Sequence, residues 1–247
     1  MNPEELNLLL SKKKSNYKKK LERRKKFTDK KDIKKYFFVH IPKCAGSQIS
    51  KLFDTTGHRT IIETNQSRSR SIKNYNLSDY YYIFSIVRNP YDRFISAYYY
   101  LKNIPDIKFD KVNRFQRDKF IKTESIEELI NLLYIDFKND KKINFHRNKS
   151  NSLVDVIHLR PMYTFICNKN KEIIIDKVVY FENMNEDINL ILKKNNINVN
   201  FIKTNASSRK DFVYYFSKIS KETIKKFNEI YYDDFKIFGY EIFENFD

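Results

Sequence analysis

The chain has 247 residues, of which 41% are hydrophobic, so it is long enough to bury the core of one larger domain. Its formal net charge of +17 predicts an anionic partner: a nucleotide, a nucleic acid, an acidic polysaccharide or a membrane surface. The two cysteines, Cys44 and Cys167, exclude a disulfide framework, and no apolar run approaches the roughly 20 residues of a membrane span. We therefore expect a soluble chain without a signal peptide or a membrane anchor.

Basic charge is concentrated at the beginning of the chain. Residues 1–35 contain 14 Lys or Arg against 5 Asp or Glu and have little apolar periodicity, which predicts a loosely helical or disordered arm. Such an arm is either a solvated extension or a segment that grips an acidic surface. The rest of the chain is basic as well, so the expectation of an anionic partner does not depend on the arm.

Three segments are predicted to be buried strands. The runs Lys35–Ile41, Tyr81–Arg88 and Asp176–Glu182 are rich in aromatic and β-branched residues and are nearly continuously apolar. This pattern is typical of strands that are covered on both faces, as in a parallel sheet.

Helical patterns separate and follow these strands. Two helices are predicted after the first two strands, from Gly46 to about Asp54 and from Pro90 to about Leu101, the latter with Asn89 as N-cap. A capping box of Ser125 and Glu128 starts a third, and a fourth runs from Asn185 to Lys194. The last helix starts at Ser220 and turns these residues inward: Ile224, Phe227, Ile230 and Tyr231. The alternation predicts an α/β fold, in which residues 36–247 form a single domain with a central parallel sheet flanked by helices.

The segment Ile41–Ile49, IPKCAGSQI, lies where the first strand gives way to a helix. In such a place the N–H groups of a tight loop and the helix N-terminus can cradle phosphate or sulfate. Gly46 would let the backbone approach closely, Lys43 would supply a positive charge, and Ser47 a hydroxyl donor. The GxxxxGK[ST] spacing of a Walker A loop is absent. The alternative is an ordinary strand-to-helix turn.

The segment Ile86–Tyr100, IVRNPYDRFISAYYY, carries a second set of anion-binding candidates. Arg88 ends a buried strand, and an Arg there points into the crevice where α/β proteins bind ligands. Its planar fork suits a phosphate, and Ser96 in the following helix adds a neutral donor. A salt-bridged strand end is the alternative for Arg88, and Arg93 is expected to be a surface charge.

The motifs PKCAGSQ and RNPYDRFISAYY resemble those of sulfotransferases that use PAPS (3′-phosphoadenosine-5′-phosphosulfate), and most closely the carbohydrate branch that includes the heparan 2-O- and chondroitin sulfotransferases. Further elements are similar in sequence order: GHRT at 57–60, HLRPMYTFI at 158–166, VVYFENMNEDINLIL at 178–192, TNASSRKDF at 204–212 and YYDDFKIFGY at 231–240. In the second of these, Met162 stands where Gln is usual. The resemblance covers about Tyr36 to Tyr240.

The resemblance implies a P-loop-like sulfotransferase fold that binds PAPS and releases PAP, its desulfated product. The loop would hold the 5′-phosphosulfate and Arg88 with Ser96 the 3′-phosphate, while Arg209 and Lys210 would close over the nucleotide. The implied donor-binding residues are Pro42, Lys43, Cys44, Ala45, Gly46, Ser47, Gln48, Arg88, Ser96, Ser207 and Arg209.

Sulfuryl transfer also needs a group that stabilises the leaving phosphate and a base for the acceptor hydroxyl. Lys43 is the expected cation on the leaving-group side. By resemblance, His58 in GHRT is the first candidate for the base, with His158 as the second and Glu63 as a further alternative. His40 is expected to be a core residue. The spacing of His and Cys predicts no metal site.

A carbohydrate hydroxyl is the expected acceptor, and an acidic glycan would suit the basic charge, while tyrosine or a small alcohol stays open. Family members in animal cells sit in the Golgi behind a membrane anchor, and no such anchor is visible in this sequence. We therefore expect a cytoplasmic enzyme of bacterial or viral origin. The alternatives are a P-loop kinase that uses ATP and Mg²⁺, a degenerate fold kept as a binding module, and a basic nucleic-acid-binding protein. A nucleic-acid partner is not expected, because many Tyr and Phe residues fall in predicted strand and helix cores.

Overall fold

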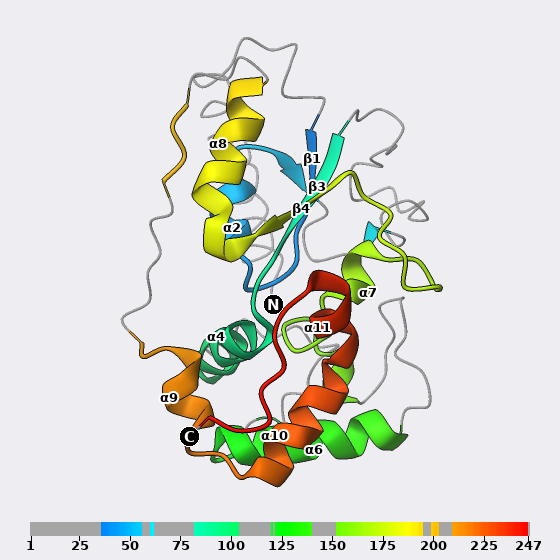
Figure 1. Cartoon of the computed structure of the whole chain (residues 1–247), viewed down its shortest axis with the longest axis vertical. Coiled ribbons are helices and arrows are strands. Elements are labelled where there is room, and N and C mark those ends of the chain that lie inside the picture. The colour runs from blue at the N-terminus through cyan, green and yellow to red at the C-terminus, as the bar shows by residue number, and fades with distance from the viewer. Residues whose placement is uncertain are drawn as a thin grey trace, which may run out of the picture.

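The computed structural model describes eight parts of the chain: residues 36–55, 60–61, 82–103, 120, 122–139, 152–194, 199–202 and 209–246. Within them the fold is built from one parallel sheet and two groups of helices (Figure 1). Residues 1–35, for which an arm is predicted, lie outside the described residues.

The described strands form one sheet in the order β2-β1-β3-β4, with every pair parallel. Their bounds are Tyr36–Val39 for β1, Asp54–Thr55 for β2, Tyr82–Val87 for β3 and Lys177–Tyr180 for β4. In the register of β1 and β3, Phe38 lies opposite Phe84 and Val39 opposite Ser85. The three predicted strands and their parallel pairing are confirmed, since β1, β3 and β4 fall within the predicted ranges. The short β2 was not predicted.

Helices connect and cover these strands. The α-helices are α2 (Gly46–Ile49), α4 (Pro90–Lys102), α6 (Ile126–Asn139), α7 (Tyr163–Ile166), α8 (Met184–Lys194), α9 (Phe212–Phe216), α10 (Lys221–Ile230) and α11 (Tyr232–Phe238); η5 (Leu153–Asp155) and η6 (Phe181–Asn183) are 3₁₀ turns. The predicted cap of α4 is confirmed, because the Asn89 side chain accepts a hydrogen bond from the Tyr91 N–H at 3.0 Å. Ser125 likewise accepts from the Glu128 N–H at 3.1 Å before α6.

Two helix boundaries differ from the prediction. The helix expected from Gly46 to about Asp54 ends at Ile49, because the chain turns back to pair Asp54 with Phe37 as β2. Phe53 is fully buried and packs edge-on against Phe84 at 5.1 Å, so the contact with the sheet overrides helix propensity. The helix from Ser220 is also not the last one, because it breaks at Tyr231 and α11 follows.

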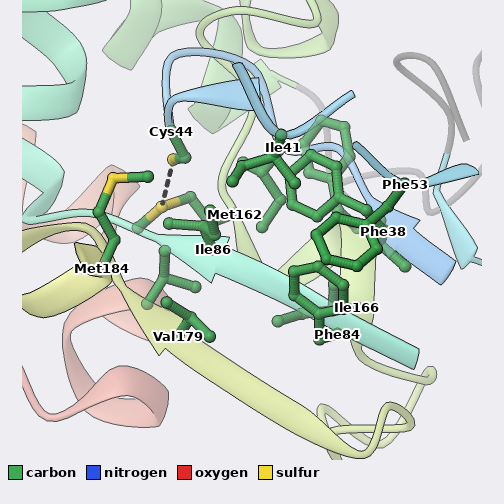
Figure 2. Close-up of a cluster of buried hydrophobic side chains, with 14 of the residues drawn as sticks. Phe38, Ile41, Cys44, Phe53, Phe84, Ile86, Met162, Ile166, Val179 and Met184 are labelled. Atoms are coloured by element: carbon green, nitrogen blue, oxygen red, sulfur yellow. Dashed lines mark hydrogen bonds between the residues drawn. The ribbon is translucent and has the colours of Figure 1, made fainter. Parts of the chain in front are cut away.

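The buried side chains form two separate cores. One surrounds the sheet, and Figure 2 shows part of it, where Phe38, Phe84, Ile86, Val179 and Met184 pack together. The other contains no strand residues: it joins α4, α6, α9, α10 and α11 around Tyr91 and Phe227. In Figure 1 α8 and α2 lie beside the strands at one end of the molecule, and α6, α9 and α10 gather at the other end. Helix α4 begins at the end of β3 and lies between these two regions.

Candidate anion-binding site

The candidate site lies at the carboxyl edge of the sheet, where β1, β3 and β4 end. From β1 the chain crosses to β2 on one side, whereas from β3 it goes on to β4 on the other side. Such a reversal of direction between adjacent parallel strands opens the crevice in which α/β proteins bind ligands. Lys43 follows β1, Arg88 follows β3 and Phe181 follows β4, so all three strands contribute residues to this edge.

The loop between β1 and α2 has an unusual backbone. Lys43 has φ 69° and Ala45 has φ 55°, which place two non-glycine residues in the left-handed region. Such conformations are uncommon, cluster at functional sites and turn successive N–H groups toward a common centre, where an anion can bind. In contrast to the expectation from sequence, α2 has only four residues, so its macrodipole adds little positive potential. Side chains must therefore supply most of the charge of the site.

Gly46 is required for a close contact inside the protein. A Cβ atom at Gly46 would lie 1.8 Å from Nε2 of His40, so only glycine leaves room for the imidazole ring. His40 follows β1 directly, is half-buried and stacks on Phe38 with ring centroids 5.7 Å apart. Gly46 was predicted to let the backbone come close to a ligand. In the structure the group that lies close to Gly46 is the His40 side chain.

Cys44 points away from the loop and into the sheet core. Its Sγ lies 3.8 Å from the Pro42 carbonyl oxygen and 3.9 Å from Sδ of Met162, the contact drawn as a dashed line in Figure 2. Burial raises the pKa of the Cys44 thiol to about 12, so it stays protonated. Cys44 is one of the predicted donor-binding residues, but only its backbone can face a ligand in the loop.

The Arg88 guanidinium is held from three sides. Its Nη1 donates to the Lys43 carbonyl oxygen at 3.1 Å, and its Nε donates to Oδ2 of Asp92 at 2.6 Å. The guanidinium carbon also lies 4.1 Å from the centroid of the Phe181 ring. The alternative of a salt-bridged strand end is therefore observed, and Arg88 is also bonded to the candidate anion loop; its role as a phosphate ligand stays a prediction.

Arg209 reaches the same place from a distant part of the chain. Its Nη2 donates to Oδ1 of Asp92 at 2.7 Å, so the Asp92 carboxylate lies between two guanidinium groups. Lys43 lies close enough to both arginines to interact with them, and the three cations form a cluster at this edge of the sheet. Desolvation lowers the pKa of Lys43 most, and the positive charges of Arg88 and Arg209 lower it further, to about 8.

The aromatic ring of Tyr100 lies between Lys43 and His158, the second candidate for the base. The Lys43 Nζ lies 4.0 Å from the centroid of the Tyr100 ring, and the His158 ring lies against the same tyrosine with centroids 4.7 Å apart. His158 is half-buried in the chain that leads into α7. The structure therefore brings His158 toward the candidate loop through Tyr100, a residue that the sequence did not single out.

Arg93 corrects one expectation. Predicted to be a surface charge, it has a side chain that is 2% exposed, and its Nε donates to the Pro42 carbonyl oxygen at 3.1 Å. It lies on the buried face of α4, together with Pro90 and Ala97. Arg93 therefore supports the loop from beneath, and its position on the buried face of α4 was the signal that could have revealed it.

The remaining predicted residues are only partly placed. Ser96 is half-buried on α4, one turn beyond Asp92, while Ser47 is exposed and Gln48 half-buried at α2. His58, Glu63 and Ser207 lie outside the described residues. The sequence analysis does not single out Asp92 or Phe181; an acidic residue in the first turn of the helix that follows Arg88 was a usable signal for Asp92.

The described part of the chain contains no group of three or more His, Cys, Asp or Glu residues that could hold a metal ion. Within the same residues no helix has the length and the apolar character needed to cross a membrane.

A parallel α/β sheet with a cation cluster at its carboxyl edge is the arrangement in which α/β proteins bind anionic ligands. The model of the sulfotransferase family matches residues 25–241, which is most of the chain, so the chain belongs to the sulfotransferase family. No curated protein and no solved structure matches it. Its α/β architecture is consistent with a sulfotransferase fold.

Proposed function

We propose that this protein transfers a sulfuryl group from PAPS to a hydroxyl group, and that the acceptor is a carbohydrate. Family membership supports sulfuryl transfer in general. The proposal rests on one further observation: Lys43, Arg88 and Arg209 gather at the carboxyl edge of the sheet, where the two arginines share the Asp92 carboxylate. An excess of positive charge at the crevice of an α/β fold suits a ligand with more than one phosphate group.

The roles of the donor-binding residues follow from this arrangement. In the proposal, the backbone of residues 42–48 and the Lys43 ammonium take the 5′-phosphosulfate, and the P-loop-like turn is the frame for it. Arg88 and Ser96 take the 3′-phosphate, and Arg209 approaches from the opposite side of Asp92. PAPS supplies the sulfuryl group and a phosphate leaving group. Lys43 would stabilise the charge that develops on that phosphate.

A base must accept the proton of the attacking hydroxyl. His58 remains the first choice by its resemblance to GHxT elements, and Glu63 remains an alternative. His158 gains support from its contact with Tyr100, because the same ring contacts Lys43. A histidine suits this role because its ordinary pKa lies near neutral pH. The proposed carbohydrate acceptor rests on the resemblance to the heparan 2-O- and chondroitin branch, and the net charge of +17 suits an acidic glycan.

Thermal unfolding with PAP, with ATP plus Mg²⁺ and without ligand tests the donor site, for the native chain and for Arg88→Ala. A nucleotide present at about 100 times its Kd should stabilise the fold by about 2.7 kcal/mol. We expect PAP to raise the Tm of the native chain without metal, and this shift to vanish in Arg88→Ala.

Two results would contradict the proposal. A larger shift with ATP and Mg²⁺ would favour a kinase, and tight, salt-sensitive binding of nucleic acid with no PAP shift would favour a polyanion-binding protein. If PAP binds as expected, transfer of a radioactive sulfuryl group from PAPS to a panel of glycans, peptides and small alcohols would identify the acceptor.

A further inference from the structure

The carboxylate of Asp92 connects the two arginines of the candidate donor site. Its Oδ2 accepts from Nε of Arg88 at 2.6 Å and lies 2.5 Å from Nη2 of the same residue. Its Oδ1 accepts from Nη2 of Arg209 at 2.7 Å, and its backbone carbonyl oxygen lies 3.3 Å from that nitrogen. Both carboxylate oxygens are therefore used, one for each arginine.

These contacts are sheltered from solvent. The side chains of Arg88 and Arg209 are 11% and 13% exposed, and that of Asp92 is 24% exposed. Charged hydrogen bonds in such surroundings are stronger and less screened than those between fully exposed groups. Without the carboxylate, two guanidinium groups and the Lys43 ammonium would repel one another across a partly desolvated space.

The contacts leave Arg88 able to bind a ligand. Asp92 takes the edge formed by Nε and Nη2, and the Lys43 carbonyl oxygen takes one N–H of Nη1. Among the contacts of the described residues, one N–H on each terminal nitrogen is left to donate to an oxyanion. The guanidinium is thus positioned by groups that leave it donors for a ligand.

We propose that Asp92 is a positioning residue of the donor site: it holds Arg88 and Arg209 together in the arrangement that receives an anionic group of the nucleotide. The inference rests on the proposed function for the identity of the ligand, but not for the link between Asp92 and Arg209. A simple electrostatic view makes the opposite prediction, because removing a carboxylate from a cation cluster should strengthen the binding of an anion.

The PAP affinities of native protein, Asp92→Asn, Arg209→Ala and the double variant, measured by calorimetry, separate these views. We expect Asp92→Asn to weaken PAP binding roughly tenfold, as is usual when a group that orients a ligand-contacting residue is lost. The effect should shrink in the Arg209→Ala background, because Asp92 acts partly through Arg209. Asp92→Glu should restore part of the affinity. The matched control is Asp187→Asn on α8. The Asp187 side chain is 23% exposed, much like that of Asp92, and it also forms an ion pair, with Lys177 of β4 at 3.3 Å.

A second readout needs no ligand. Trypsin must take the Arg209 side chain into its own pocket, so the bond to Asp92 should protect the peptide bond after Arg209. We expect the ratio of cleavage after Arg209 to cleavage after the neighbouring Lys210, measured by mass spectrometry, to rise several-fold in Asp92→Asn but not in Asp187→Asn. An unchanged ratio together with equal or tighter PAP binding would overturn the inference. If native protein fails to bind PAP, the proposed function falls, and the cleavage ratio alone decides the role of Asp92.

Discussion

The ammonium group of Lys43 lies above an aromatic ring and close to two arginines. Desolvation, followed by Arg88 and Arg209, lowers the pKa of Lys43 from 10.5 to about 8. Folding therefore makes the charged form of Lys43 less favourable when no ligand is bound. The free energy of unfolding should rise as the pH increases from about 8 toward 10.5, because Lys43 keeps its proton to higher pH in the unfolded chain than in the folded protein.

An anion bound beside Lys43 would favour the charged amine and raise its pKa again. The affinity for PAP should accordingly be constant below about pH 8 and fall above it, by up to tenfold per pH unit until the pKa in the complex is reached. Calorimetric titrations between pH 6.5 and 10 would measure this profile. The phosphate groups of PAP are already fully ionised above pH 8, so they add no slope there.

Lys43→Arg provides the control for this profile. A guanidinium keeps its charge throughout that range, so the fall above pH 8 should disappear even if the absolute affinity changes. A native affinity that does not change up to pH 10 would mean that Lys43 does not contact the bound anion.

At the scale of elements, helix α11 and the start of α7 are joined beneath the candidate loop. Asp234 on α11 accepts hydrogen bonds from the backbone N–H groups of Met162 and Tyr163, both at 2.8 Å. Burial raises the pKa of Asp234 to about 6, although Arg93 and these two N–H groups oppose the rise. The RPM stretch at 160–162 and the YDDF stretch at 232–235 are thus held together by one buried carboxylate.

Met162 gives this junction an apolar contact with the loop. Its side chain is fully buried and lies 3.9 Å from the sulfur of Cys44 (Figure 2). Glutamine would bring an amide into this apolar space, so Met162→Gln should lower the free energy of unfolding by about 1–3 kcal/mol. Met162→Leu preserves volume and apolar character and should cost less than about 1.5 kcal/mol. Urea denaturation of the two variants tests the difference, and equal stabilities would show that a polar partner for the amide exists nearby.

At the scale of the whole molecule, the parts predicted well from sequence were those fixed by local patterns. The strands around Phe38 and Phe84 were continuously apolar, and Asn89 followed by Pro90 marked the start of α4. Those strands and that cap locate Lys43 and Arg88 at one edge of the sheet without any knowledge of distant contacts.

The rest depended on contacts between distant segments. Asp92 and Arg209 are 117 residues apart, so no local pattern could show that they pair. The position of Arg93 on the buried face of α4 can be predicted from the helical pattern, but its partner, the Pro42 carbonyl oxygen, lies in another loop and cannot. The length of α2 was set by the pairing of Asp54 with β1, which a short apolar run does not reveal.

The division of the interior into two cores has a consequence for how the protein would respond to a ligand. Lys43 and Arg88 adjoin the sheet core, whereas Asp92 and Arg209 adjoin the helical core through α4 and α9. A partial opening that separates the two cores would dismantle the cation cluster while each core stayed packed, and a bound anion would oppose that opening. Binding at the crevice should therefore slow the exchange of backbone amide hydrogens with deuterium at the start of α4, which joins the two cores, and leave the exchange in α6 and α10, inside the helical core, unchanged.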